Sequence, residues 1–303
     1  MKAALLREVD GPFELADVPD PEADGRVVVR VRAAGINFAD VLIRRGRYPQ
    51  MPQLPVILGS EVAGELDDGT RVMAITPGAG GYAEKVAVDR AQIVPLPDNA
   101  SFAEGASFLL TFLTAYIPLS RQVRLRPGSS VLVTAAAGGV GTAAIQVART
   151  LGARVVAAVG SREKLAVCLE LGAAEAYVYD ELPEDLRVDA VLDPVAGDLF
   201  ERGLGALRPL GTLIAIGFAG GMWPEVNPAT LVGRNVGVQG FYLGRLLRHE
   251  PEVVGEAVRE LLALWQTGAL RPLVGGEFPL GEVDHAHALV ESRASVGKVV
   301  LLP

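Results

Sequence analysis

Two glycine-containing stretches of this 303-residue chain could do chemistry, and the first is VLVTAAAGGVG, residues 131–141. An apolar, β-branched run leads there into a glycine-rich turn and then directly into a helical pattern, which is the context of a dinucleotide-binding loop. Glycines let the backbone approach a pyrophosphate, and a helix N-terminus offers free N–H groups to it. The residues expected to form this loop are Ala137, Gly138, Gly139, Val140 and Gly141. A plain tight turn between packed elements is the alternative, since Ala136 stands at the first glycine position.

The next strand, RVVAAV, bears on which dinucleotide would bind. A site that prefers NAD carries Asp or Glu about 20 residues after the loop, to bind the ribose 2′-hydroxyl. Here the strand ends in Gly160 and Ser161, followed by Arg162 and Lys164 at the start of a helix. The helix dipole disfavours cations at that end, and a bound 2′-phosphate would explain them. We therefore expect NADPH, with two solvated surface charges as the alternative.

The second stretch, LGSEVAG, places Ser60 between a glycine and an acid. A catalytic serine of a hydrolase is disfavoured because the chain lacks a G-x-S-x-G elbow. A metal site made of several thiolates and an intrachain disulfide are both impossible, because Cys168 is the one cysteine. His285 and His287 lie two apart in a helical pattern and so do not share a face. The sequence predicts no metal site.

The elements that must position these residues fall into two groups. The first hundred residues contain short β-like runs with Gly/Pro punctuation, which predicts a β-rich domain. A helix or helix pair is expected over about residues 101–120. From Ser130 strands and helices alternate, which predicts a parallel sheet covered by helices on both faces. A long amphipathic helix from about residue 251, then a helix and a closing strand, complete an α/β chain.

Composition excludes several classes of function. The net charge of −8, without a Lys/Arg cluster, makes nucleic acid an unlikely partner. The start, MKAALLREVD, meets charge before any signal-peptide core develops. The longest uncharged run, Pro127 to Ala148, is interrupted by glycines, which argues against a membrane helix. We expect a cytoplasmic protein that does not bind membranes.

The chain resembles the zinc-free quinone oxidoreductase branch of the medium-chain dehydrogenase/reductase superfamily. AAGINFADVLIRRGRYP, LPVILGSEVAG, GYAEKVAV, VLVTAAAGGVG and ESRASVGKVVLLP carry the resemblance, in order along almost the whole chain. It implies a GroES-like catalytic domain of residues 1–112 and 241–303, and a doubly wound Rossmann domain of residues 113–240 that binds NADPH.

The resemblance also assigns catalytic residues. Zinc-dependent relatives carry a Cys and a His ligand in G-x-C-x-x-D and G-H-E-x-x-G motifs, where this chain has Asn37 and Ser60. The cleft would then be free of zinc, with Asn37 and Tyr48 as hydrogen-bond donors near the nicotinamide and Asp40 as an orienting group. One departure is Leu42, where the family often has tyrosine.

Further cofactor contacts follow from the same resemblance. Besides the loop, the residues concerned are Gly160, Ser161, Arg162, Lys164, Thr114, Tyr179, Gly217, Phe218, Phe241 and Lys298. For Lys298 two roles stay open: reaching the cofactor phosphates, or a salt-bridging or surface role.

Without a metal, the easier substrates are acceptors that are already electrophilic. The expected activity is therefore reduction of quinones by NADPH, with a small-molecule quinone or enone as substrate. An NADPH-dependent enone or enoyl reductase is the nearest alternative, and a nucleotide-binding structural or regulatory protein is an alternative of another class. The resemblance further implies a homodimer formed through the edge strand near VGVQGFY.

Overall fold

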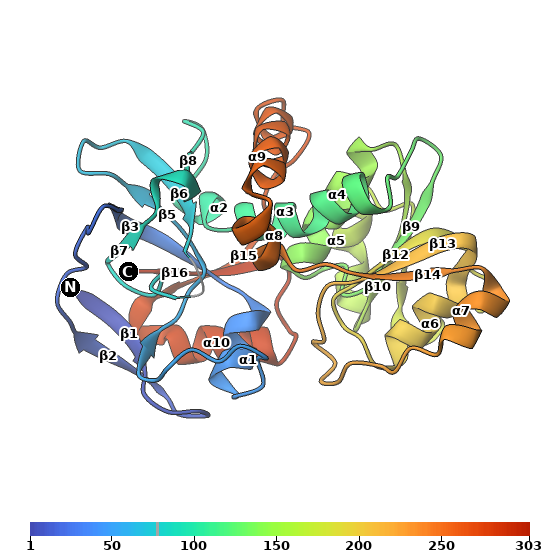
Figure 1. Ribbon diagram of the computed structural model, residues 1–303, viewed down its shortest axis with the longest axis horizontal. Helices are drawn as coiled ribbons and strands as arrows, with labels where there is room; N and C mark the ends of the chain where they lie inside the picture. Colours follow the sequence, from blue (N-terminus) through green and yellow to red (C-terminus); the bar gives the residue numbers. More distant parts are fainter. Residues whose placement is uncertain (77–78) are drawn as a thin grey trace. The chain divides into compact units, whose positions relative to one another are not determined.

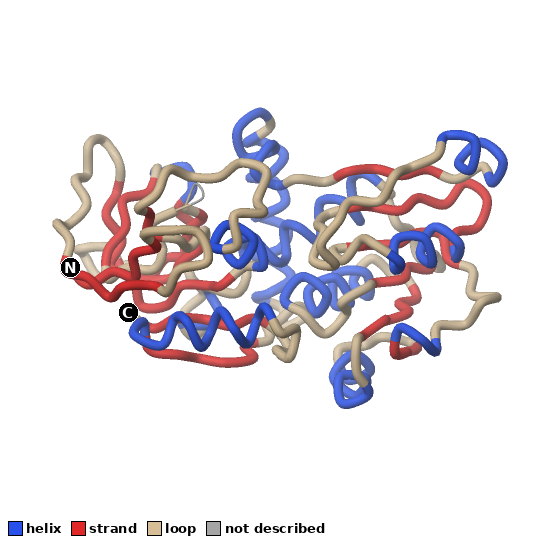
Figure 2. The backbone as a smooth tube through the Cα atoms, turned by 90° about the horizontal axis from the view of Figure 1, so that it is seen from below, coloured by secondary structure: helices blue, strands red, loops and turns tan. Residues whose placement is uncertain are grey.

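The structure, a computed structural model, describes residues 1–76 and 79–303. The chain divides into two compact units. Residues 1–110 and 272–303 form one, named here the β-rich unit, and residues 111–271 form the other, named the Rossmann unit. Figures 1 and 2 show both ends of the chain close together in the β-rich unit. The expected α/β class, with a β-rich part and a doubly wound parallel-sheet part, is confirmed.

The β-rich unit contains two sheets. A three-stranded sheet has the order β2-β1-β4, and a seven-stranded sheet has the order β15-β16-β3-β5-β6-β8 with β7 paired to β3. The strands are β1 (Lys2–Leu6), β2 (Phe13–Asp17), β3 (Val27–Ile36), β4 (Val56–Ile57), β5 (Glu61–Glu65), β6 (Arg71–Ile75), β7 (Lys85–Val88), β8 (Ile93–Pro95), β15 (Val274–Pro279) and β16 (Lys298–Leu302). The helices are α1 (Phe38–Arg44), α2 (Phe102–Gly105) and α10 (Val283–Glu291).

The Rossmann unit is built on a six-stranded parallel sheet of order β11-β10-β9-β12-β13-β14. Its strands are β9 (Ser130–Val133), β10 (Arg154–Val159), β11 (Glu175–Val178), β12 (Val188–Asp193), β13 (Leu207–Ala215) and β14 (Gly237–Gly240). Its helices are α4 (Gly139–Thr150), α5 (Leu165–Glu170), α6 (Asp198–Ala206), α7 (Pro228–Arg234), α8 (Leu243–His249) and α9 (Pro251–Gln266), and α3 (Leu109–Ile117) begins at the division between the units. Figure 1 shows α4 and α5 on one side of the sheet and α6 and α7 on the other.

This strand order reverses direction between β9 and β12. The chain leaves β9 toward β10 and β11, then returns to continue through β12 to β14. Ligands of such doubly wound sheets bind beyond the carboxyl ends of the strands, where the order reverses. The loop predicted from the sequence follows β9 and therefore lies at that point.

The second boundary between the units differs from the one expected from the sequence. Residues 241–271, assigned there to the first domain, lie in the Rossmann unit. The reason is packing: α9 buries Val254, Ala257, Leu261 and Trp265. In addition, the side chain of Gln146 in α4 bonds both the N–H of Arg271 (2.8 Å) and its carbonyl (2.9 Å).

One helical segment has the composition of a membrane span. Phe102–Gln122 is long and apolar enough by length and hydropathy alone, yet 78% of that window is buried inside the structure. Core helices of soluble proteins show the same combination. The longest uncharged run of the sequence, Pro127 to Ala148, is a different segment and folds into β9, the glycine loop and most of α4.

Candidate functional site

Strand pairing in the β-rich unit brings three polar residues to one face of the large sheet. Gly35 in β3 pairs with Glu61 in β5 on one side and with Val300 in β16 on the other. Paired residues of antiparallel strands point to the same face, and so do residues two positions apart on a strand. Asn37 follows Gly35 by two residues and Lys298 precedes Val300 by two. Hence Asn37, Glu61 and Lys298 meet although they are far apart in sequence.

A buried ion pair joins these residues. The Lys298 ammonium contacts Glu61 Oε1 and donates to Asn37 Oδ1 at 2.6 Å. The other oxygen of Glu61 accepts the N–H of Leu110 at 3.1 Å. Lys298 and Glu61 are almost completely buried. The salt bridge is one of the two roles that the sequence left open for Lys298, and it is present in the structure.

Gly35 makes this pair possible. A β-carbon at position 35 would lie 2.9 Å from Glu61 Oε1, 2.9 Å from Lys298 Cε and 2.2 Å from the carbonyl oxygen of Ala106. Real β-carbons essentially never come this close to other heavy atoms, and the Ala106 carbonyl belongs to the backbone and cannot rotate away, so this position requires glycine.

A second buried chain of hydrogen bonds holds the backbone of Asn37. Its N–H donates to Asp40 Oδ2 at 2.8 Å, and the Tyr82 hydroxyl donates to the same oxygen at 3.0 Å. His287 Nε2 lies 3.2 Å from the Tyr82 oxygen. Because that hydroxyl gives its one proton to Asp40, its oxygen accepts from His287, which fixes the neutral tautomer with the proton on Nε2. Asp40 is thus placed to orient Asn37 through its backbone.

Burial shifts the pKa of each ionisable group in this series of hydrogen bonds. Desolvation raises the pKa of the Asp40 carboxyl to about 6, although the bonds from Asn37 and Tyr82 favour its ionised form. Desolvation lowers the pKa of His287 to about 3 and raises that of the Tyr82 phenol well above its ordinary value. His287 therefore stays uncharged at neutral pH, and burial opposes the ionisation of Asp40. His285, on the same helix, is exposed.

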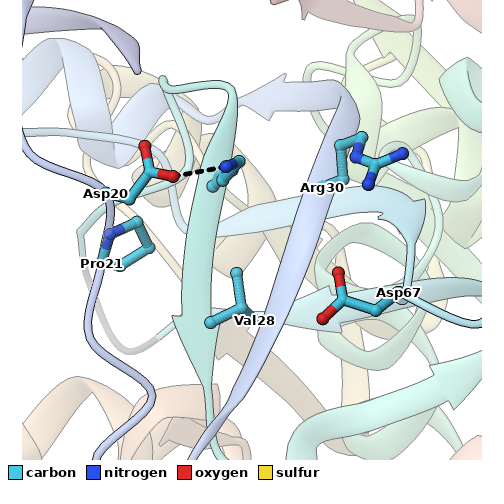
Figure 3. Close-up of a pocket in the computed structure, with 6 residues that line it drawn as sticks. Asp20, Pro21, Val28, Arg30 and Asp67 are labelled. Atoms are coloured by element: carbon cyan, nitrogen blue, oxygen red, sulfur yellow. Dashed lines mark hydrogen bonds and ion pairs between the residues drawn. The ribbon is translucent and has the colours of Figure 1, made fainter.

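Tyr48, the remaining predicted catalytic residue, follows α1 and packs, half-buried, against the hydrophobic core of the β-rich unit. None of the predicted site residues lines the pocket shown in Figure 3. That pocket, of about 220 Å³, is lined by Asp20, Pro21, Val28, Arg30, Asp67 and Lys85. Asp20 there is paired with Lys85.

The glycine loop of the Rossmann unit has the geometry that the sequence predicts. Helix α4 begins at Gly139 with Gly138 as its N-cap, and its first backbone bond runs from Thr142 N–H to the Gly138 carbonyl (2.8 Å). The N–H groups of the first turn have no intrahelical partner in any α-helix, and they carry the positive end of its dipole. Gly141 packs against the loop itself, since a β-carbon there would lie 2.3 Å from the Ala135 carbonyl oxygen.

Most other predicted cofactor residues follow the carboxyl ends of the parallel strands. Gly160 follows β10, Tyr179 follows β11, Gly217 and Phe218 follow β13, and Phe241 follows β14. The exceptions are Thr114, which lies within α3, and Lys298, which belongs to the β-rich unit. The fold thus gathers the rest at one edge of the sheet. The residues present fit a dinucleotide at this edge, with its phosphates at the glycine loop.

The polar residues after β10 are engaged with acids. Ser161 Oγ donates to Glu163 Oε1 at 2.5 Å, and the exposed Arg162 guanidinium contacts Glu181. Lys164 is partly buried, and this desolvation lowers its pKa. Gly160 carries no side chain, and a β-carbon there would lie 3.5 Å from the Tyr179 ring. If a phosphate bound here, Ser161 and Arg162 would contact it in place of these carboxylates.

One hydrogen-bonded connection at this edge was not predicted from the sequence. Thr134 Oγ1 donates to Asp193 Oδ1 at 2.6 Å, and Asp193 also accepts the N–H groups of Val195 (2.9 Å) and Ala196 (3.1 Å). The bond ties β9 to β12 where the strand order reverses. An acid at the end of the apolar run DAVLD was the available signal.

Comparisons with known proteins decide the family. The sequence profile of the alcohol dehydrogenase GroES-like domain matches residues 23–98, and that of zinc-binding dehydrogenase matches residues 139–263. Quinone oxidoreductase-like protein 2 of Bos taurus is 35% identical over an alignment 320 residues long, gaps included, which covers 99% of this chain and 92% of that protein. The chain belongs to the quinone oxidoreductase branch of the medium-chain dehydrogenase/reductase superfamily. The expectation from the sequence is thereby confirmed.

Solved structures of this quinone oxidoreductase branch share the whole fold. The quinone oxidoreductase of Thermus thermophilus, determined alone and in complex with NADPH, is 45% identical, with full coverage of both chains and a TM-score of 0.94. Escherichia coli quinone oxidoreductase complexed with NADPH is 30% identical, with coverage of 100% of this chain and 99% of that one and a TM-score of 0.90.

One of the matching family descriptions names zinc, but the donor atoms present in this quinone oxidoreductase chain do not suit a zinc ion. Asn37 Oδ1 and Glu61 Oε1 both face the Lys298 ammonium, and a divalent cation beside it would be repelled. Zinc in proteins prefers Cys, His and carboxylate ligands, whereas Ser60 offers a neutral hydroxyl. Among residues 1–76 and 79–303, no group of three or more His, Cys, Asp or Glu side chains is placed to hold a metal ion.

Proposed function

We propose that this chain is an NADPH-dependent quinone reductase that works without a metal. The observation that carries the proposal is the Lys298 ammonium between Asn37 and Glu61, because a cation that already engages both oxygens leaves no place for a Lewis-acid metal beside them. The NADPH complexes of two relatives support the cofactor. We further propose a cytoplasmic protein that binds neither membranes nor nucleic acid.

The proposed roles of the residues are those that the family resemblance implies, and the chemistry of each side chain suits its role. NADPH supplies a hydride to the acceptor. The amide of Asn37 and the hydroxyl of Tyr48 donate hydrogen bonds to the acceptor oxygen as negative charge develops there. Asp40 orients Asn37 through its backbone N–H. The loop of residues 137–141 binds the pyrophosphate, and the residues after β10 bind the adenosine ribose and its 2′-phosphate.

Parallel assays of NADPH oxidation test the function. The acceptors are 1,4-benzoquinone, a medium-chain enone and an enoyl thioester, and we expect benzoquinone to give the highest kcat/KM. Turnover with the thioester alone would replace the quinone assignment by an enoyl reductase. Tight NADPH binding without turnover of any acceptor would favour a structural or regulatory role.

Cofactor preference should depend on Arg162. Arg162→Ala is expected to raise the Kd for NADPH roughly tenfold and to leave the Kd for NADH almost unchanged, because only NADPH carries the 2′-phosphate that the guanidinium would contact. Titration of protein fluorescence with each cofactor measures both constants. Arg154→Ala is the matched control, since Arg154 lies at the other end of β10 and is also paired with a glutamate. An equal weakening of both cofactors by Arg162→Ala would contradict the assignment.

We also propose a homodimer formed through β14, the edge strand of the Rossmann sheet. Leu210, 90% exposed, donates its N–H to the Asn235 carbonyl just before β14. Other large apolar side chains exposed in this part of the chain are Met222 and Trp223, which follow β13, and Val232 in α7. Exposed apolar surface is typical of interfaces.

Leu210→Glu should therefore convert a dimer into a monomer, because a charge in the interface would lose its hydration. Light scattering after size exclusion measures the mass. Leu169→Glu, which changes an exposed leucine of α5, should leave the dimer intact. A wild-type chain that is monomeric would overturn the proposal.

A further inference from the structure

Lys298 is an unusual lysine because the fold buries it almost completely. A buried ammonium is tolerated when a carboxylate and further acceptors compensate its lost hydration. Glu61 supplies that charge, and its second oxygen is held by Leu110 N–H at 3.1 Å. Glu61 therefore fixes the position of the ammonium, and Asn37 is the second residue that the ammonium contacts.

The ammonium determines which way the Asn37 carboxamide faces. An ammonium only donates hydrogen bonds, so it can face the amide oxygen and not the amide nitrogen. Oδ1 lies 2.6 Å from Lys298 Nζ, which turns Nδ2 away from it. Nδ2 is buried, and no hydrogen-bond acceptor reaches it within the described structure.

An unpartnered buried NH2 group costs free energy, and native structures seldom keep one without a use. The backbone of Asn37 is held as well, because Asp40 accepts its N–H at 2.8 Å. Both the main chain and the oxygen of the amide are thus fixed, and the two N–H bonds of Nδ2 are what remains for a ligand. A ligand with a carbonyl-type oxygen would accept one of them.

We propose that Lys298 is a positioning residue: it holds the Asn37 carboxamide with its NH2 turned away from the ammonium, as an unpartnered donor for the acceptor oxygen. This inference rests on the quinone reductase function proposed above. Donation of a charged N–H to Oδ1 also polarises the amide, which strengthens the bond that Nδ2 donates as the acceptor oxygen gains negative charge. Lys298 acts through Asn37 and touches neither substrate nor cofactor.

A double-mutant cycle on kcat tests this coupling. Asn37→Ala is expected to lower kcat about 100-fold, as loss of one such donor does. Lys298→Met should lower it at least about tenfold, and the double variant should be no slower than Asn37→Ala, because residues that act as a unit are not additive. KM for benzoquinone and Kd for NADPH should stay within about threefold of wild type, since the loss is confined to the transition state.

Lys298→Met leaves Glu61 buried without its partner and can fail to fold. The variant Glu61→Gln/Lys298→Met removes both charges, and the introduced glutamine keeps an oxygen for Leu110 N–H, so the cycle is run in that background too. Lys85→Met, which removes a surface lysine paired with Asp20, is the matched control and should leave kcat unchanged.

The side-chain amide of Asn37 gives a readout that needs no substrate. The chain has four asparagines, Asn37, Asn99, Asn227 and Asn235, so 15N-asparagine labelling gives four NH2 pairs, and Asn37→Ala identifies the relevant one. We expect this pair to shift or broaden in Glu61→Gln/Lys298→Met and to be unchanged in Lys85→Met.

Three results would overturn the proposal: an unchanged Asn37 NH2 signal, an unchanged kcat in the folded charge-free variant, or additive losses with a salt-dependent tenfold weakening of NADPH binding. The last would make Lys298 a phosphate ligand. If the wild type fails to turn over benzoquinone, the proposed function is wrong, and the NMR comparison still decides whether Lys298 positions Asn37.

Discussion

Gly141→Ala should raise the Kd for NADPH at least about 100-fold and destabilise the Rossmann unit by about 3 kcal/mol or more. A β-carbon at this position would lie 2.3 Å from the Ala135 carbonyl oxygen and 2.6 Å from the carbonyl carbon and Cα of Ala136. All three atoms belong to the backbone and cannot rotate away as a side chain can. The loop would have to move off α4, together with the bond from Gly138 N–H to the Ala135 carbonyl (2.9 Å).

The same displacement would move the N–H groups that the phosphates are proposed to contact. Fluorescence titration with NADPH and thermal unfolding without it separate the two effects. Gly205→Ala is the matched control, because Gly205 lies in helix α6 of the same unit and a β-carbon there would meet no atom within 4 Å. That variant should be neutral or more stable by up to about 1 kcal/mol. Unchanged NADPH binding by Gly141→Ala would contradict the assignment of this loop to the cofactor.

The sequence predicted the Rossmann unit well because its signals are local. Strands of a parallel sheet are buried on both faces, so they read as continuous apolar runs. In β10, for example, all residues after Arg154 are buried, and in β9 every residue is. The glycine loop joins one such strand to the next helix within a few residues, and both elements are visible in the sequence without knowledge of the fold.

The cluster in the β-rich unit could be predicted only in part. Asn37 and Tyr48 were named from resemblance, but the ion pair was not, because 237 residues separate Glu61 from Lys298. Charged residues are usually exposed, and nothing near Glu61 in LGSEVAG marks it as buried. Strand register brings the two together, and register between distant segments is not visible in a single sequence. Ser60, the residue that drew attention to this stretch, lies next to the ion pair in sequence.

His287→Gln should reduce the loss of folding stability that the protein undergoes as the pH falls. The pKa of His287 is about 3 in the folded chain and about 6.5 in the unfolded one, so only the unfolded chain takes up this proton between these values. Stability therefore falls as pH falls. Between pH 7 and pH 5 the loss from this residue is about 2 kcal/mol. The glutamine of the variant keeps an N–H donor for Tyr82 and does not titrate, so the variant should lose about that much less than wild type.

Asp40 should act with the opposite sign. Its pKa is about 6 in the folded chain against an ordinary 3.8, so the folded chain takes up this proton first and is stabilised as pH falls. The gain between pH 7 and pH 5 is about 1 kcal/mol, and Asp40→Asn, which removes it, should make stability fall more steeply than in wild type. Denaturant unfolding at several pH values measures both slopes, with His285→Gln, an exposed histidine of the same helix, as control. Asp40 and His287 both bond the Tyr82 hydroxyl, yet their two substitutions should change the pH dependence of stability in opposite directions. A change in the same direction would mean that one of these two groups is not buried as described.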